Sequence, residues 1–377
     1  MSPAAERSGV PGVAGAGAPA VQARGAPAPE LELRPSSPAD DAERDDFVLA
    51  HPRGTFFHTA GWRRAVEQAM GHAPRDIVAL RDGKVAGVLP LMRSPALWGP
   101  PAWISMPYAV YGGPLGDAPG VERGLVAEAL RRGAAEGAGR LELRSLEAQE
   151  PLEHPRVARS ELYATFIADL PAERAEVLAR MPKKARAEAR KARERHGLRL
   201  NEGVWYLEDF YRLFQENKRS LGSPGLPAAL FKALCGEFGP RVHVHLVQKG
   251  SQPLAGVMSF EWRDTLLAYY AGTARGADRE WSASNFMYMA LREWAVERGL
   301  RRFDFGRSRK DSGAFRFKEH QGFAPRDLEY RFYLLRDRRP PSFTPSNPRT
   351  RVLRETWSKL PLGVTRRLSD VVARYLP

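Results

Sequence analysis

Residues that could do chemistry gather in the last third of the chain, between Ala268 and Tyr330. Aromatic residues including Tyr270 run into Gly272, and farther on Asp304 stands between two phenylalanines. After Asp304 the chain is rich in glycine and positive charge. The basic residues of this segment are Arg307, Arg309, Lys310, Arg316 and Lys318. A cationic loop at the end of a strand is a common way to build a site for an anion or an acyl group.

The elements that must position this loop are a helix and a short strand. Met287, Leu291 and Trp294 recur at helical spacing, which predicts a helix with one apolar face. Gly299 is a typical helix stop. A short strand is expected at residues 302–305, so the cations follow its end.

The rest of the chain predicts two mixed α/β units. In the first half, the Asp82-Gly83 turn joins two strands, and a helix and an alternating strand follow. The expected elements of that half are strands at 76–80, 85–91 and 140–144 and a helix at 120–137. Those of the second half are strands at 163–169, 242–248, 254–262 and 265–271 and helices at 172–195, 205–219 and 226–238. The coarse order repeats, which predicts two copies of one fold.

Length and composition agree with two domains in one globular chain. The chain has 377 residues, 43% of them hydrophobic and 27% charged. No run of about 18 apolar residues predicts a membrane span. The single cysteine, Cys235, allows no disulfide within the chain and fits the cytoplasm. The predicted division is a disordered leader at 1–44, domains at 45–159 and 160–335, and a basic tail at 336–377.

Positive charge is clustered, and this predicts a polyanionic partner. The net charge is +14. Residues 183–195 hold seven basic and two acidic residues, and residues 336–377 hold ten and three. The first segment has only alanines at its apolar positions, so it should lie on the surface. Its candidate contacts to a phosphate backbone are Lys183, Lys184, Arg186 and Arg190, although a solvated face explains them equally well.

Two other segments leave alternatives open. Residues 351–376 predict a basic amphipathic helix or helix pair that docks on the protein's own body or on an anionic membrane surface. Residues 95–114 are rich in proline, glycine and aromatics and form either a packed wall or the lip of a ligand site. His243 and His245 share one face of a strand without a third ligand in sight, so no metal site is expected.

The residues from Tyr269 to Phe323 carry a resemblance to a known family. Their succession YYAG…N…A…G…FDFGRS…FK…GF resembles the FemAB-like, or peptidoglycan-bridge aminoacyltransferase-like, proteins of the GNAT superfamily. It looks closest to the branch associated with PEP-CTERM/exosortase systems. Further matching pieces are Leu89-Pro90-Leu91, Tyr111-Gly112-Gly113, Leu141-Glu142-Leu143-Arg144, Pro182-Lys183-Lys184-Ala185-Arg186 and Asn217-Lys218-Arg219-Ser220-Leu221-Gly222.

This resemblance implies two tandem GNAT-like domains and an acyltransferase. The best-known relatives move an aminoacyl group from charged tRNA to an amine on a cell-wall precursor. They share a Phe-Lys pair, here Phe317-Lys318, whose lysine lies at the transfer site. We therefore expect a cytoplasmic enzyme, peripheral at the inner membrane face if the tail binds there. Its acceptor would be a small-molecule or lipid-linked precursor of the cell envelope or of an exopolysaccharide.

The chemistry of acyl transfer suggests roles within the expected site. Lys318 would stabilise the oxyanion, Asp304 would accept the amine's proton or orient Arg307, and Tyr270 would bond substrate or merely pack. Arg307 and Arg316 would hold phosphates or a carboxylate. The full set of expected substrate-binding residues is Arg307, Arg316, Phe317, Tyr108, Tyr111 and Asn285.

The acyl donor and two alternative functions stay open at this point. GNAT enzymes hold the coenzyme A pyrophosphate with an Arg/Gln-x-x-Gly-x-Gly/Ala loop, of which residues 272–277 are a loose echo. The chain also shows no inserted coiled-coil arm like that of the bridge enzymes. The donor is therefore either aminoacyl-tRNA or acyl-CoA, with no tightly bound cofactor. The alternatives are a coenzyme A-dependent N-acetyltransferase of a sugar or peptide amine, and a non-catalytic GNAT-fold module that binds a polyanion or membrane.

Overall fold

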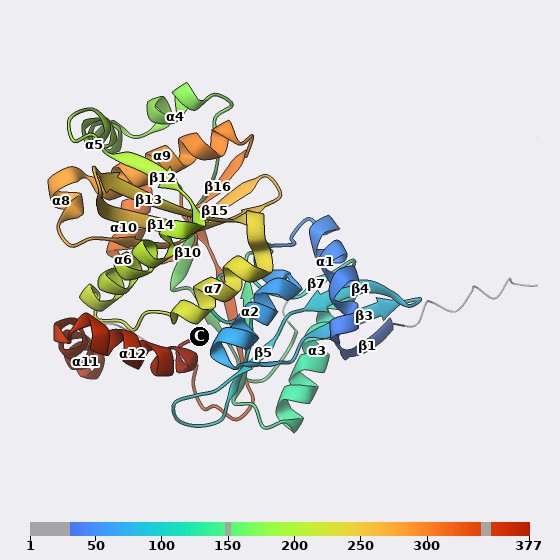
Figure 1. Ribbon diagram of the computed structural model, residues 1–377. Coiled ribbons are helices and arrows are strands. Elements are labelled where there is room, and N and C mark those ends of the chain that lie inside the picture. Colours follow the sequence, from blue (N-terminus) through green and yellow to red (C-terminus); the bar gives the residue numbers. More distant parts are fainter. Residues whose placement is uncertain (1–30, 148–151, 341–347) are drawn as a thin grey trace, which may run out of the picture.

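The computed structural model describes residues 31–147, 152–340 and 348–377, and it forms two lobes (Figure 1). The first lobe holds most of the N-terminal elements. Its helices are α1 (Asp41–Ala50), α2 (Ala60–Met70) and α3 (Pro119–Ala135). One sheet has the order β1-β3-β4-β7, with β1 (Leu31–Pro35), β3 (Ile77–Arg81), β4 (Lys84–Leu89) and β7 (Leu115–Gly116).

The first lobe's other sheet has the order β2-β5-β6-β8-β19-β9. These strands are β2 (Ala73–Pro74), β5 (Met92–Ser94), β6 (Ala102–Ser105), β8 (Arg140–Ser145), β19 (Glu329–Leu334) and β9 (Val157–Ser160).

The second lobe is built on a sheet of order β11-β16-β15-β14-β13-β12. Its strands are β11 (Ile167–Asp169), β12 (Arg199–Glu202), β13 (Val242–Lys249), β14 (Gln252–Trp262), β15 (Thr265–Thr273) and β16 (Arg302–Asp304). Its helices are α4 (Arg174–Arg180), α5 (Lys183–Glu194), α6 (Leu207–Ser220), α7 (Ala228–Phe238), α8 (Ala277–Trp281), α9 (Ala283–Glu297) and α10 (Gly313–His320). A small sheet, β17-β10-β18, joins β10 (Tyr163–Thr165), β17 (Ser308–Arg309) and β18 (Arg326–Asp327).

Each lobe contains one parallel strand pair joined by a crossover helix. In the first lobe β6 and β8 run parallel and α3 connects them; in the second, β15 and β16 run parallel and α9 connects them. Helix α9 is buried on nearly every side and not on one face alone, with Met287 and Leu291 among its buried residues, and Gly299 beyond its end takes a φ of +76°. The repeated unit confirms the predicted mixed α/β fold with two like-built halves.

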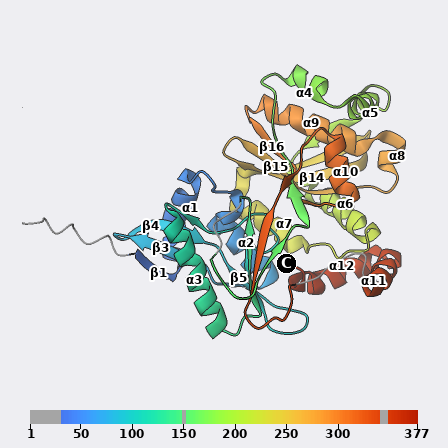
Figure 2. The same ribbon diagram turned by 180° about the vertical axis from the view of Figure 1, so that it is seen from behind.

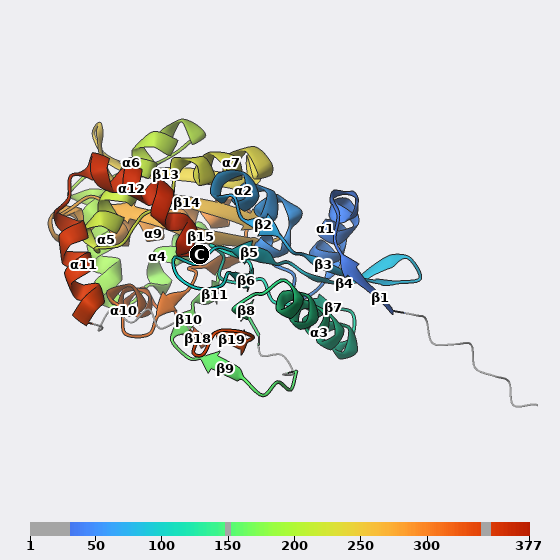
Figure 3. The same cartoon turned by 90° about the horizontal axis from the view of Figure 1, so that it is seen from below.

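The second half of the chain contributes a strand to a sheet of the first lobe. β19, which the predicted division assigns to residues 160–335, pairs with β8 of the first lobe, Glu329 opposite Ser145. Figure 3 shows β8, β9 and β19 together. β9, at the predicted boundary between residues 159 and 160, pairs with β19 as well. The domain boundaries themselves stay a prediction.

The lobes also share a hydrophobic core. The Phe56 ring of the first lobe stacks on Phe260 of the second, with centroids 4.7 Å apart, and it also contacts Phe238. Helix α2 packs against α7 across the same boundary. A large apolar boundary of this kind holds two lobes in one fixed arrangement.

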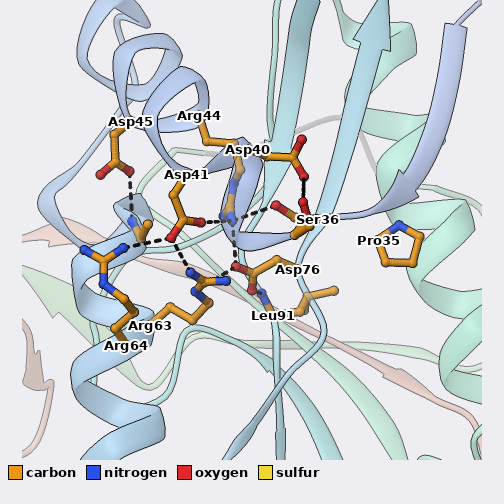
Figure 4. A network of polar contacts seen from close by, with 12 residues as sticks. Pro35, Ser36, Asp40, Asp41, Arg44, Asp45, Arg63, Arg64, Asp76 and Leu91 are labelled. Carbon is orange, nitrogen blue, oxygen red and sulfur yellow. Dashed lines mark hydrogen bonds and ion pairs between the residues drawn. The ribbon is translucent and has the colours of Figure 1, made fainter.

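The prediction of a disordered leader is wrong for residues 31–44, which form β1 and the start of α1. β1 pairs with β3 along its whole length. Arg44, with 1% of its surface exposed, bonds Asp76 at 2.9 Å and Ser36 at 3.0 Å (Figure 4). The alanine- and proline-rich context hid a short alternating strand whose order depends on partners far along the chain. Residues 1–30 lie outside the described part.

The loop predicted to carry all the cations after Asp304 is partly helical. Arg316 and Lys318 lie on α10, which begins at Ser312, where Ser312 Oγ accepts a hydrogen bond from the Phe315 N–H at 3.1 Å. This N-cap is a common start signal that the surrounding glycines and charges concealed.

The C-terminal tail forms α11 (Pro348–Lys359) and α12 (Leu362–Val372), followed by a single 3₁₀ turn at Ala373–Tyr375. The predicted helix pair is therefore confirmed. Both helices contact α6 (Figures 1 and 2). Gly225 N–H donates to Ser369 Oγ at 3.1 Å, and Arg219 donates to the Leu360 carbonyl at 3.2 Å. The tail thus docks on the protein's own body.

Candidate active site

Asp304 lies at the end of β16, where the two lobes meet, and 4% of its surface is exposed. Its Oδ1 accepts hydrogen bonds from the Gly306 N–H at 2.7 Å and from the Tyr111 hydroxyl at 3.4 Å. Burial disfavours the charged form and raises the pKa of this carboxyl to about 6. Because Tyr111 belongs to the first lobe, the carboxyl joins both halves.

Lys318 of α10 sits beside this carboxyl. Its Nζ donates to the Gly306 carbonyl at 2.8 Å and to the Arg307 carbonyl at 3.1 Å. The ammonium also lies 5.3 Å from the centroids of the Phe166 and Phe305 rings. Burial lowers the pKa of Lys318 to about 7, while the nearby Asp304 charge opposes that shift. The ammonium is therefore enclosed and fixes the loop at residues 306–307.

Arg307 is held by aromatic residues. Its guanidinium stacks over the rings of Tyr163 at 4.7 Å and Tyr330 at 5.6 Å, and Nη1 donates to the Tyr330 hydroxyl at 3.1 Å. Tyr330 in turn donates to the Val110 carbonyl at 2.7 Å. Stacking and hydrogen bonding leave the guanidinium with a fixed direction, as an anion-binding arginine requires.

A second aromatic group lies around Tyr108. Tyr269 and Tyr270 both donate their hydroxyls to the Tyr108 carbonyl, at 2.8 and 3.4 Å. Tyr108 has a φ of +59°, which is uncommon for a residue with a side chain, and its own hydroxyl donates to the Ala373 carbonyl at 3.1 Å. Tyr270 also packs on Phe231. In this structure Tyr108, Tyr111 and Tyr270 are buried, as are all of residues 102–114, whereas Leu97 and Trp98 are exposed.

Lys218 is a residue that we did not single out from the sequence. It lies near the end of α6, where burial and the neighbouring Arg307 charge lower its pKa. Its Nζ lies 5.3 Å from the Phe214 ring, and no hydrogen bond or ion pair engages it within the described part of the chain. The available signal was the Asn217 to Gly222 segment of the family resemblance. Two neighbouring cations without an acidic partner are suited to hold an anion.

The remaining predicted substrate-binding residues have mixed positions. Phe317 packs against Phe305 and Tyr288. Asn285 Oδ1 accepts a hydrogen bond from Gln321 Nε2 at 2.6 Å, and Arg316 is exposed on α10. The structure thus brings Asp304, Arg307, Lys318, Tyr108, Tyr111 and Tyr270 to the lobe boundary, whereas Arg316 points to solvent.

The start of α9 is already occupied by a carboxylate. Asp278 accepts hydrogen bonds from the Ser284 N–H at 2.7 Å and from the Ser284 hydroxyl at 2.9 Å. Residues 272–277, the loose echo of a coenzyme A loop, lead directly into the short helix α8, and α9 follows it. An anionic side chain at the positive end of a helix takes the place that a phosphate would need.

A cavity of about 370 Å³ lies in the first lobe at the start of α3. Its lining includes Arg53, Asp117, Pro119, Arg331 and Tyr333. Asp304, Arg307 and Lys318 do not line it. The cationic helix α5 lies at the far end of the second lobe (Figure 1), with Ala185, Ala189 and Ala192 buried and Lys183, Lys184 and Arg190 exposed. Arg186 is half-buried and bonds the Ala179 carbonyl.

The chain can now be compared with known proteins. Residues 179–319 match the family model described as "Acetyltransferase (GNAT) domain". No curated protein sequence matches the chain. FemX has a similar structure, with 16% identity, a TM-score of 0.59 and coverage of 81% of this chain and 98% of FemX.

Two further solved structures are similar. A tandem GNAT protein from the clavulanic acid biosynthesis pathway is 16% identical, with a TM-score of 0.51 and coverage of 83% of this chain and 100% of that one. A conserved protein of unknown function from Bacteroides thetaiotaomicron is 12% identical, with a TM-score of 0.52 and coverage of 81% and 100%. At such identities the likeness concerns the fold. The fold is similar to that of the tandem GNAT protein, and residues 179–319 are the part that matches the GNAT domain model.

Proposed function

We propose that the protein is an acyltransferase that moves an aminoacyl group from an ester to an amine of a cell-envelope or exopolysaccharide precursor. The observation that carries this proposal is the pair of shifted groups at the lobe boundary. Burial raises the pKa of Asp304 to about 6 and lowers the pKa of Lys318 to about 7. Shifted titratable groups that converge in this way are typical of catalytic sites.

The chemistry needs an acid group, a base and a place for an anion. The neutral amine attacks the ester carbon, a C–N bond forms, and the carbonyl oxygen becomes negative. When the intermediate collapses, the C–O bond to the donor breaks and the leaving oxygen takes a proton. Lys318 would donate its third N–H to the oxyanion, an interaction worth about 3 kcal/mol. Asp304 would receive the amine's proton, and Arg307 with Lys218 would hold an anionic part of a substrate.

The start of α9 favours an ester donor over coenzyme A. Asp278 already accepts the hydrogen bonds that a pyrophosphate would receive there. The exposed basic face of α5 offers a surface for the backbone of a tRNA. The likeness to FemX and the residue-level resemblance to FemAB-like proteins, including the PEP-CTERM-associated branch, support an envelope precursor as acceptor.

A coenzyme A-dependent N-acetyltransferase is the second candidate. The GNAT domain match and the likeness to a tandem GNAT protein favour it. Calorimetry with acetyl-CoA separates the two, because the proposed ester donor predicts no binding heat. A non-catalytic module would show no turnover with either donor.

Replacing Lys318 tests the proposed site. We expect Lys318→Ala to lower kcat/KM by about 10²–10³-fold, measured as transfer of labelled amino acid from aminoacyl-tRNA to an envelope-precursor amine. In the wild type, kcat/KM should fall as pH rises through about 7, because Lys318 loses its proton. For Lys318→Arg, kcat/KM should not fall over this pH range, because arginine stays protonated.

The matched control is Lys310→Ala, which removes a lysine paired with Asp327 at 2.9 Å. It should transfer at the wild-type rate. Near-normal transfer by a folded Lys318→Ala variant, shown to be native by circular dichroism, would remove the lysine from the mechanism.

A further inference from the structure

Helix α12 turns small side chains inward and three of its five large aliphatic side chains outward, while Leu362 and Val372 are half-buried. Thr365 and Ser369 are buried, as is Ala373 just beyond the helix. Val364, Leu368 and Val371 are 42%, 41% and 62% exposed. A helix that only covered the body would turn the larger apolar residues toward it. The inverted orientation indicates that the outer face has another contact.

Helix α11 also turns aliphatic side chains to solvent. Val352 is 61% exposed and Leu353 is 70% exposed, and the exposed Arg351 precedes them. Arg354 instead donates to the Leu221 carbonyl of the body at 3.1 Å. We use the name tail surface for the exposed side chains of Val352, Leu353, Val364, Leu368 and Val371 together with the exposed Arg351 and Arg367.

The inner face of the tail is already used. Hydrogen bonds from Gly225 to Ser369, from Tyr108 to Ala373 and from Arg219 to Leu360 fix the helices on the body. The tail surface therefore faces away from its own protein. Docking on the body and contact with a membrane, which the sequence left as alternatives, are compatible with each other.

We propose that the tail surface binds the face of an anionic lipid bilayer. Residues 348–377 contain seven Lys or Arg and two acidic residues, so the charge around the apolar side chains is complementary to lipid phosphates. Aliphatic side chains interleaved with arginines are suited to the boundary between headgroups and acyl chains. Among the described residues no helix has the length and apolar character to cross a bilayer, so the contact is a peripheral one.

Sedimentation with vesicles tests this contact. The full chain should cosediment with vesicles of phosphatidylcholine and phosphatidylglycerol, bind at least about tenfold more weakly to phosphatidylcholine alone, and lose binding as salt rises. A Leu353→Asp/Leu368→Asp/Val371→Asp variant should bind the anionic vesicles at least about tenfold more weakly, because it replaces aliphatic groups with charges that anionic lipids repel.

The matched control is Leu49→Asp, which alters an aliphatic residue of α1 that is 53% exposed in the first lobe. It should bind like the wild type. Equal binding of the wild type to both kinds of vesicle, or unchanged binding of the triple variant, would overturn the proposal. So would a wild-type dimer in size-exclusion chromatography that the triple variant dissociates, because the surface would then be an interface between copies.

Discussion

Charged side chains are buried in different ways at two places, one in the first lobe and one at the end of β16 in the second. In the first lobe, Arg44 and Asp76 form an ion pair at 2.9 Å, and Glu142 and Arg144 form another at 2.8 Å on β8. At the end of β16 in the second lobe, Asp304 bonds a backbone N–H and a hydroxyl, and Lys318 bonds two backbone carbonyls.

This difference separates structural from chemical use of charge. A buried ion pair compensates the desolvation of both partners, so its removal damages the fold. A buried charge that meets mainly neutral dipoles keeps part of its desolvation cost. This cost raises the pKa of an acid and lowers the pKa of a base. The arrangement around Asp304 and Lys318 therefore places two groups with shifted pKa values at the lobe boundary.

The crossover helices differ in a parallel manner. The start of α3 in the first lobe borders a cavity of about 370 Å³. The start of α9 in the second lobe is capped by Asp278. The two copies of this supersecondary unit therefore differ: the helix start in the first lobe borders a cavity, and the helix start in the second is hydrogen-bonded to a carboxylate.

The largest expected effect comes from breaking a first-lobe ion pair. Arg44→Met leaves Asp76 buried with only the more distant Arg63, at 3.7 Å, as a charged partner. We expect the free energy of unfolding to fall by about 3 kcal/mol. Urea unfolding followed by circular dichroism measures it. The control is Arg64→Met, whose side chain is 44% exposed and bonds Asp41 and Glu237. Its cost should stay within about 1 kcal/mol.

A small effect of Arg44→Met, no larger than that of Arg64→Met, would break the comparison. It would mean that the Arg44 and Asp76 pair contributes little and that residues 31–44 are held by the strand pairing of β1 alone.

A second-lobe charge should respond in the opposite direction. Because the folded pKa of Asp304 is about 6 against an ordinary 3.8, the folded state takes up a proton that the unfolded state does not. The contribution of Asp304 to the free energy of unfolding should therefore rise as pH falls from about 7 to about 4. Asp304→Asn removes the ionised form, so at pH 8 it should stabilise the protein by about 2 kcal/mol.

Thermal unfolding at several pH values measures this effect, with Asp327→Asn as a control, an exposed acid that pairs with Lys310. If Asp304→Asn destabilises the protein at pH 8, the carboxylate is a structural partner like Asp76, and the contrast between the lobes disappears.

The smallest expected effect concerns the cap of α9. Asp278→Ala removes the acceptor for the Ser284 N–H and should lower the free energy of unfolding by about 1 kcal/mol, whereas Asp278→Asn should cost a few tenths. Urea unfolding distinguishes them. If the free energy of unfolding falls no more in Asp278→Ala than in Asp278→Asn, the carboxylate does not cap the helix.

The sequence predicted those elements that local patterns define. The apolar face around Met287 and Leu291 and the stop at Gly299 placed α9, and the Asp82-Gly83 turn placed a hairpin. β1 was missed because its pairing with β3 joins residues on either side of two helices. The pairing of β19 with β8 was missed for a similar reason, since no local pattern records which sheet a strand will join.

The site was predicted in part for the same physical reason. Asp304, Arg307 and Lys318 lie close in sequence and stay close in the fold. Their partners come from far away: Tyr111 is 193 residues from Asp304, and Lys218 belongs to another helix. The spacing of residues reveals neighbours along the chain. Burial and long-range contacts produce the pKa shifts, and they cannot be inferred from local sequence patterns.

The pairing of β8 with β19 has a consequence for the newly made chain. One edge of β8 stays unpaired until β19 has been synthesised, because Ser145 pairs with Glu329. At ~5–20 residues per second, a ribosome needs roughly 10–40 s to make the intervening polypeptide. For that time the nascent first half carries an open hydrogen-bonding edge that could join a neighbouring chain on the same messenger RNA, so a chaperone that shields it would raise the yield of native protein.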